Sequence, residues 1–260
     1  MALFDSHCHL NDEKFDNDRD VIIKEIYEAG VSNFIVVGYD LESSKKAISI
    51  AQKYDFIYAT VGISPNDIPH SEEELWKLLV EIGDLAKNCG KVVAIGEIGL
   101  DYYWNSDNKD IQKSAFIKQI ELANNLDLPI VIHTRDAVMD TVQILKDNNV
   151  KCKGVFHCCP QNRELIKEGL KLGFYISFAG PITFKNSKNA DEVINLVPND
   201  KILIETDSPY LAPEPVRGTR NTSVNVKFIA EKIANTKGLS FEEVANFTEE
   251  NANMIFKINK

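Results

Sequence analysis

Short apolar runs alternate with longer segments in which apolar residues recur every three or four positions, and this alternation continues along the whole chain. The short runs are typical of buried β-strands, and the longer spacing is typical of amphipathic helices. The predicted strands are residues 3–6, 33–37, 57–61, 92–97, 130–133, 154–157, 174–178 and 202–205. Helical patterns lie between them, the clearest at 20–29 and 111–126.

This order of elements predicts one α/β domain over residues 1–260 with parallel strands, because no linker or change of composition interrupts it. At 260 residues, a single (β/α)8 TIM barrel is the architecture that best fits eight strand–helix repeats. A doubly wound open sheet is the alternative. No glycine-rich GxGxxG loop or P-loop follows any predicted strand, which counts against that alternative.

Histidines and carboxylates gather at the carboxyl ends of the predicted strands, where a barrel of this kind places its active site. The candidate metal ligands are His7, His9, Glu97, His133, His157 and Asp207. His7 and His9 alternate along the chain, so both project from one face of a strand. Each residue alone suits a turn, a helix cap or a hydrogen-bonded strand end. Together they would be a costly set of converging polar groups without a ligand, so we predict a metal centre.

The number of ligands fits two divalent ions that share one bridging carboxylate, which we assign to Glu97. The other ligands divide into His7, His9 and Asp207 around one ion and His133 and His157 around the other. Two cations about 4 Å apart stabilise the attacking and leaving oxygens of a displacement and lower the pKa of a bound water. Imidazole-rich sites favour Zn or Mn over Mg, but metal availability also decides occupancy, so all three stay candidates.

Five separated motifs contain these residues. They are DSHCHL at 5–10, GEIGLDYY at 96–103, HTRD at 133–136, GVFH at 154–157 and ETDSPYLAP at 205–213. In this order, over essentially the whole chain, they resemble the TatD family of metal-dependent hydrolases, as does RGTRN at 217–221. The resemblance implies a TIM barrel of the amidohydrolase type, two divalent metals, and deoxyribonuclease or phosphodiesterase activity. It also implies the same six ligands.

The chain departs from the family pattern at two places. After the third predicted strand the family usually has a histidine before proline, where this chain has Ser64 before Pro65. In the loop after the last strand the usual Arg-Asn-Glu-Pro is Arg-Asn-Thr-Ser at 220–223. Neither change removes a metal ligand. The first removes a group that would face the substrate or transfer a proton.

Three arginines at the same end of the barrel are candidates for substrate binding: Arg135, Arg217 and Arg220. Arg135 directly precedes a predicted helix, where a cation opposes the helix dipole and a bound phosphate would favour it. Each arginine could instead have a structural ion pair. The aromatic residues at 102–104 could stack on a base or close a hydrophobic lid.

Composition narrows the class of protein further. Hydrophobic residues at 44% and charged residues at 26% are typical of a soluble globular enzyme. A net charge of −10 argues against non-specific coating of nucleic acid, although it does not exclude a nuclease. No apolar run has membrane-spanning length, the amino terminus lacks a signal-peptide pattern, and the five cysteines have no framework spacing. We therefore expect a cytoplasmic protein with reduced thiols and no membrane partner.

The leading functional hypothesis is a metal-dependent phosphodiesterase or deoxyribonuclease. DNA or a nucleotide-like phosphodiester would be cleaved by a metal-activated water, with Glu97 and Asp207 as catalytic residues. One alternative is a hydrolase of a small carboxylic ester, lactone or amide; many such enzymes bridge their metals with a carboxylated lysine at strand 4, but Lys91 lies at the wrong end of that strand. A second is a non-catalytic binding protein, made imaginable by Ser64. The sequence predicts no oligomeric state.

Overall fold

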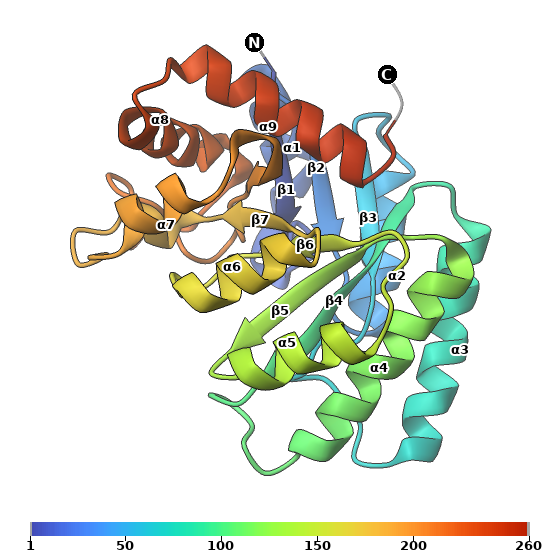
Figure 1. Ribbon diagram of the computed structural model, residues 1–260. Coiled ribbons are helices and arrows are strands. Elements are labelled where there is room, and N and C mark those ends of the chain that lie inside the picture. Colours follow the sequence, from blue (N-terminus) through green and yellow to red (C-terminus); the bar gives the residue numbers. More distant parts are fainter. Residues whose placement is uncertain (1, 259–260) are drawn as a thin grey trace.

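The computed structural model describes residues 2–258, in which eight parallel strands form one sheet in sequence order (Figure 1). The strands are β1 Leu3–Cys8, β2 Val31–Val37, β3 Ile57–Val61, β4 Val92–Asp101, β5 Ile130–Arg135, β6 Gly154–Phe156, β7 Tyr175–Phe178 and β8 Ile202–Ile204. Parallel neighbours need a crossover between them, and the helices supply it. All strands run in one direction, so their carboxyl ends meet at one end of the sheet.

The helices of the described residues lie on the outside of this sheet. They are α1 Arg19–Glu28, α2 Leu41–Ala51, α3 Glu72–Asn88, α4 Lys109–Leu126, α5 Val138–Asp147, α6 Arg163–Lys171, α7 Ala190–Leu196, α8 Val226–Lys237 and α9 Phe241–Ile255. Local sequence explains the start of α9, where Ser240 and Glu243 form a reciprocal capping box. None of the helices in residues 2–258 combines the length and the apolarity that crossing a bilayer requires.

The sheet curves until its first and last strands meet. The Asp207 N–H donates to the His7 carbonyl at 2.9 Å, and the His9 N–H donates to the Ser208 carbonyl at 2.7 Å. One residue earlier on β1, the Ser6 hydroxyl donates to the Ile204 carbonyl at 3.0 Å. These bonds join the two edges into a nearly closed (β/α)8 barrel, so the predicted TIM-barrel fold is confirmed.

The inside of the barrel and α9 form one apolar cluster. Phe4, Ile35 and Leu203 from the strands pack with Ile255 and Phe256 at the end of α9. This helix lies across the end of the sheet at which the strands begin (Figure 1). The Asn251 side chain of α9 donates to the Ile202 carbonyl at 2.8 Å and fixes the helix there. The carboxyl ends of the strands stay free for polar side chains.

Strand 4 is longer than the sequence pattern predicts. The pattern predicts that Glu97 ends the strand, but β4 continues to Asp101. Its pairing with β5 shifts register between Ile95 and Ile98, an irregularity that interrupts the hydrogen-bond ladder around Glu97. The prediction of the strand end is therefore wrong, and Glu97 lies within an irregular strand. Strands β6 and β8, by contrast, end before His157 and Glu205.

Candidate metal centre

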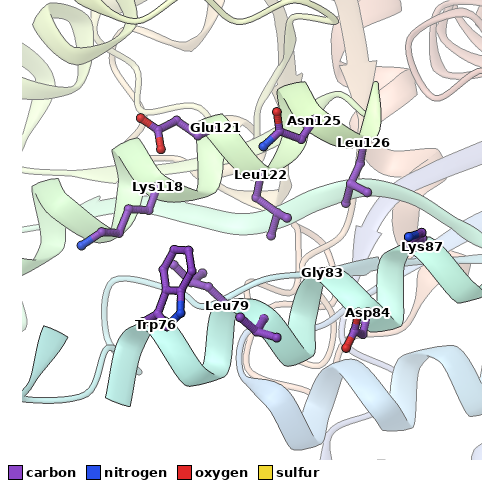
Figure 2. Close-up of a pocket in the computed structure, with 11 residues that line it drawn as sticks. Trp76, Leu79, Gly83, Asp84, Lys87, Lys118, Glu121, Leu122, Asn125 and Leu126 are labelled. Carbon is purple, nitrogen blue, oxygen red and sulfur yellow. The ribbon is translucent and has the colours of Figure 1, made fainter. Parts of the chain in front are cut away.

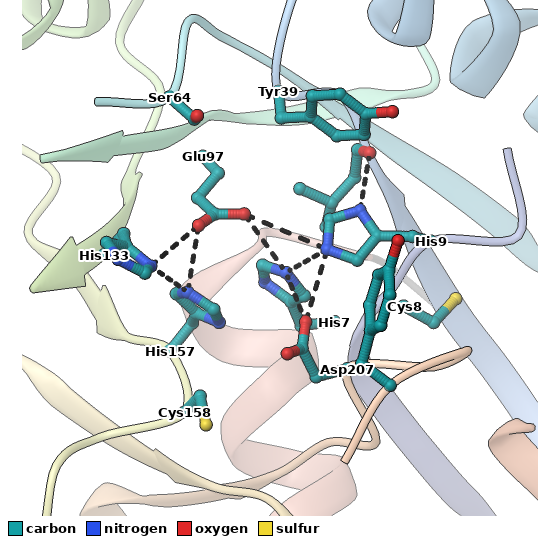
Figure 3. Close-up of polar contacts among 12 residues, drawn as sticks. His7, Cys8, His9, Tyr39, Ser64, Glu97, His133, His157, Cys158 and Asp207 are labelled. Atoms are coloured by element: carbon teal, nitrogen blue, oxygen red, sulfur yellow. Dashed lines mark hydrogen bonds and ion pairs between the residues drawn. The ribbon is translucent and has the colours of Figure 1, made fainter. Parts of the chain in front are cut away.

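Six side chains from five strands and their following loops converge at the carboxyl end of the barrel (Figure 3). One cluster contains His7, His9 and Asp207. The Nε2 atoms of His7 and His9 are 3.2 Å apart, and the Asp207 Oδ1 atom lies 3.5 Å from the first and 3.2 Å from the second. Cys8 points away between the two histidines, and its thiol donates to the Ile35 carbonyl. Alternation along the chain thus places both imidazoles in the same cluster.

A second cluster is formed by His133, His157 and Glu97. The Nδ1 atom of His133 lies 2.9 Å from the Glu97 Oε1 atom and 3.2 Å from the His157 Nε2 atom. The His157 Nε2 atom is itself 3.2 Å from the same carboxylate oxygen. His133 lies within β5, two residues before its end, so the predicted end of this strand at His133 is wrong. His157 immediately follows β6. These neighbouring strands deliver both imidazoles to one oxygen of Glu97.

Glu97 lies between the two clusters and presents a different oxygen to each. Its Oε1 atom faces His133 and His157. Its Oε2 atom is 3.6 Å from the His7 Nε2 atom and 3.9 Å from the His9 Nε2 atom. Figure 3 shows the carboxylate between the two groups of imidazoles. This is the arrangement expected of a carboxylate that bridges two ions.

The distances between the donor atoms fit metal coordination. An ion with tetrahedral bonds of about 2.0–2.1 Å to nitrogen holds its ligand atoms about 3.3 Å apart. In each cluster of three side chains, one donor atom from each residue lies within 4.8 Å of the others. Imidazoles with carboxylates are a donor set that suits Zn, Mn and related ions. The residues present therefore fit divalent metal.

Electrostatics within the site keep the central carboxylate ionised. Burial opposes the ionisation of Glu97, but the nearby His157 and His133 outweigh it and hold the pKa of this carboxyl well below its usual range. Burial, followed by the neighbouring His157 and His9, lowers the pKa of His7 well below its usual value. Without metal, the nearby carboxylates outweigh burial and raise the pKa of His133 and His157, so a metal ion would compete with protons for these two rings.

Asp101 supports this centre, and the sequence did not reveal it. Its Oδ2 atom accepts a hydrogen bond from the His133 Nε2–H at 2.9 Å, while its Oδ1 atom accepts from the backbone N–H groups of Tyr103 and Trp104. A carboxylate behind a metal-binding histidine fixes the ring and its tautomer. The available signal was its place in the GEIGLD motif, four residues after Glu97.

Two hollows of about 420 Å³ each meet at the ligand clusters. Both are lined by His133, His157, Asp207 and Tyr210. The first extends toward Arg135, and the second toward Tyr39, Ser64 and Asp67. A substrate held at the centre can therefore place one substituent in each hollow.

Arg135 and the loop after β4 form a stack beside the first hollow. The guanidinium carbon lies 3.7 Å from the centre of the Tyr103 ring and 5.4 Å from that of Trp104. Both aromatic side chains are exposed. Stacking of this kind holds the guanidinium plane while leaving its N–H donors free for a ligand.

The other two predicted substrate-binding arginines have different surroundings. Arg220 forms a two-point ion pair with the Asp18 carboxylate at 3.0 and 2.5 Å and also donates to the Lys14 carbonyl. Arg217 lies over the Phe184 ring, with its guanidinium carbon 4.1 Å from the ring centre. Neither residue lines the two hollows at the ligand clusters.

Ser64, which replaces the histidine usual in the resembled pattern, lies in the second hollow. It is buried, and its hydroxyl donates to the Asp67 carboxylate at 2.5 Å. Burial, opposed by this bond, raises the pKa of Asp67 above its usual value. This wall of the site is thus polar and acidic.

A further hollow of about 360 Å³ lies far from these ligands, between α3 and α4 (Figure 2). Trp76, Leu79 and Leu122 supply its apolar lining, and lysine and acidic side chains surround them. No histidine or cysteine of the described residues lines it. It therefore lacks the donor set of a transition-metal site.

The sequence profile of the TatD related DNase family matches residues 4–257. The chain belongs to the TatD family. The resemblance carried by the five motifs is thus confirmed over nearly the whole chain.

Individual relatives agree with this assignment. The Bacillus subtilis protein YabD, named an uncharacterized metal-dependent hydrolase, is 46% identical, and the alignment covers 99% of this chain and 100% of YabD. The mouse protein TATDN3, provisionally named a deoxyribonuclease, is 30% identical over 98% of this chain and 88% of its own length. The crystal structure of the Escherichia coli TatD homologue YJJV superposes with a TM-score of 0.92 at 24% identity, covering 99% and 98% of the two chains. The last likeness concerns the fold.

Proposed function

We propose that this TatD-family protein is a two-metal phosphodiesterase that cleaves DNA or a nucleotide-like phosphodiester. The central observation is that the two oxygens of Glu97 face two separate ligand clusters. Two ligand clusters that share a carboxylate suit metal-dependent hydrolysis, which is the activity named for YabD. Membership of the DNase family and the name of TATDN3 favour a phosphodiester as the substrate.

The residues divide into those that would hold metal and those that would act on the substrate. His7, His9 and Asp207 would hold one divalent ion, His133 and His157 the other, and Glu97 both. Such ions supply positive charge to a phosphate and lower the pKa of a water molecule. Asp207, whose side chain is partly exposed and lines both hollows, would accept the proton of the attacking water.

Arg135 would bind the substrate beside the metals. Its side chain is exposed at the edge of the first hollow, and no ion pair occupies it among the described residues. Its N–H groups suit the non-bridging oxygens of a phosphate. Tyr103 and Trp104 would offer a stacking surface for a base next to that phosphate. The two hollows would then receive the groups on either side of the scissile bond.

A hydrolase of lactones, carboxylic esters or amides is the competing function. A lysine bridge of the kind used by many such enzymes has no counterpart here. Lys91 precedes β4 at the opposite end of the barrel, where its ammonium donates to the Tyr54 and Asp55 carbonyls. Glu97 takes the place of that bridge between the two clusters.

The test is a substrate panel with defined metal. Purified protein, stripped with a chelator and reloaded with Mg, Mn or Zn, would be incubated with single-stranded DNA, duplex DNA, RNA, a model phosphodiester and lactones. We expect metal-dependent cleavage of at least one phosphodiester, and no cleavage in the stripped protein. Turnover of lactones or amides without any phosphodiester turnover would overturn the proposal.

A further inference from the structure

Glu205 is a second carboxylate beneath the metal centre. It follows β8, is completely buried, and lies beside the imidazoles of His7 and His157. Those two rings stack with their centres 4.0 Å apart and their planes 10° from parallel. One donor atom from each of the three side chains lies within 4.8 Å of the others. A single carboxylate thus reaches a ligand from each of the two clusters.

Only one of its oxygens has partners. The Oε1 atom accepts a hydrogen bond from the Cys158 backbone N–H at 2.6 Å and lies 3.3 Å from the His157 Nδ1 atom. The Oε2 atom is buried without a hydrogen-bond partner, and so is the His7 Nδ1 atom. A buried donor or acceptor without a partner has lost its hydrogen bonds to water without a replacement, which is unfavourable. Two such atoms next to one metal centre require an explanation.

The chemistry of imidazole supplies one. His7 and His157 both direct Nε2 toward the ligand clusters, where it faces Asp207 and Glu97. A neutral ring that binds metal through Nε2 carries its proton on Nδ1. That N–H needs an acceptor on the side away from the metal. In the described residues, a Glu205 oxygen lies 3.3 Å from the His157 Nδ1 atom, and the same carboxylate forms a cluster with His7 and His157 whose donor atoms are within 4.8 Å of one another.

We propose that Glu205 is a positioning residue shared by the two halves of the metal centre. Its Oε1 atom accepts a hydrogen bond from the His157 Nδ1–H. Its Oε2 atom, which has no partner, would accept one from the His7 Nδ1–H when a metal ion holds that ring through Nε2, so one carboxylate would fix the tautomer of a ligand to each ion. The inference rests on the proposed two-metal centre but not on the choice of substrate. Asp101 offers a matched comparison, because it contacts only His133 among the ligands.

The experiment compares Glu205→Gln with Asp101→Asn in Zn²⁺ titrations against a chelator. Loss of a carboxylate behind a metal-binding histidine typically weakens metal binding about 10–100-fold. We expect Glu205→Gln to weaken both zinc sites by such a factor and Asp101→Asn to weaken one. Circular dichroism would establish that both variants are folded. Unchanged zinc affinity at both sites in a folded Glu205→Gln protein would overturn the proposal.

A second measurement needs no variant. In ¹⁵N-histidine-labelled wild-type protein loaded with zinc, NMR should show both His7 and His157 with Nδ1 protonated and Nε2 bound to metal. Protonation of His7 at Nε2, or a third zinc ion bound between Glu205 and the two rings, would overturn the proposal. Protein that shows the expected tautomers and two bound ions but cleaves no phosphodiester would overturn the proposed function alone.

Discussion

Asp5 and Asp101 are both completely buried aspartates next to the metal centre, yet they favour opposite protonation states. Asp5, on β1, accepts from the Thr206 N–H at 2.9 Å and from its hydroxyl at 2.6 Å, next to His7. Burial raises the pKa of the Asp5 carboxyl to about 7. Asp101 lies beside the other ligand cluster, behind His133. Burial opposes its ionisation too, but the His133 hydrogen bond and the Trp104 N–H outweigh that effect and bring its pKa to about 2.

Burial alone therefore does not decide the charge of these two carboxylates. Asp5 has neutral donors, which satisfy its oxygens without supplying positive charge. Asp101 faces an imidazole whose own pKa is raised by its acidic neighbours against the effect of burial. The cluster that contains His7 therefore lies next to a carboxyl group, Asp5, whose pKa is near neutrality. The cluster that contains His133 lies next to Asp101, which stays ionised.

The largest loss of activity should follow from replacing the residue that faces both ligand clusters. Glu97→Ala removes the oxygens that face both clusters, so turnover should fall below about a thousandth of the wild-type rate and both metals should bind more weakly. Elemental analysis of reloaded wild-type protein should approach two ions per chain. Circular dichroism must show an intact fold for the variant. Activity within a few-fold of wild type would show that Glu97 does not bridge.

The contrast between the two aspartates can be tested through pH. The folded pKa of Asp5 is about 7 against 3.8 for the free side chain, so unfolding releases a proton between these values and stability falls as pH rises through this window. In metal-free protein, Asp5→Asn removes this dependence. From pH 5 to pH 8 the unfolding free energy of the variant should gain about 3 kcal/mol relative to wild type. Denaturation curves would give the unfolding free energies. The same difference between variant and wild type at pH 5 and pH 8 would contradict the raised pKa of Asp5.

Replacing Arg135 would show whether the first hollow, which His133 also lines, binds a phosphate group. Arg135→Ala should cost about 2–3 kcal/mol of transition-state stabilisation on a phosphodiester, because it removes charge-assisted contacts to the phosphate. The loss should be absent on any lactone or amide that turns over. Arg220→Ala is the matched control, since its guanidinium pairs with Asp18 away from both hollows. An equal loss on both substrate classes would identify Arg135 as structural.

The smallest effect concerns Ser64, in the hollow that His9 also lines. Serine cannot hold a proton near neutral pH, whereas a histidine beside Asp67 could donate one to a leaving group. Ser64→His should raise phosphodiester turnover about tenfold, below the roughly 10²–10⁴-fold of an evolved general acid, and add a pH dependence. Measurements of kcat against pH on the model phosphodiester would check this. No change on any substrate would make Ser64 a neutral loop residue.

Local patterns in the sequence are enough to predict the barrel and most of its strands. Apolar runs alternating with amphipathic helices are local patterns, and parallel strands in sequence order bring all their carboxyl ends together. For that reason six polar side chains at predicted strand ends could be grouped before any distance was known. Even the pairing of His7 with His9 follows from strand geometry.

The support of those groups depends on tertiary packing. Each cluster faces its own oxygen of Glu97, which lies in an irregular part of β4. Asp101 and Glu205 acquire their contacts from strands 32 and 48 residues away in sequence, and Arg220 meets Asp18 across 202 residues. Local periodicity contains no information about such partners, because they depend on how strands register and how loops close over the barrel. The candidate ligands can therefore be identified from local sequence. Their protonation, orientation and surroundings depend on how the chain packs.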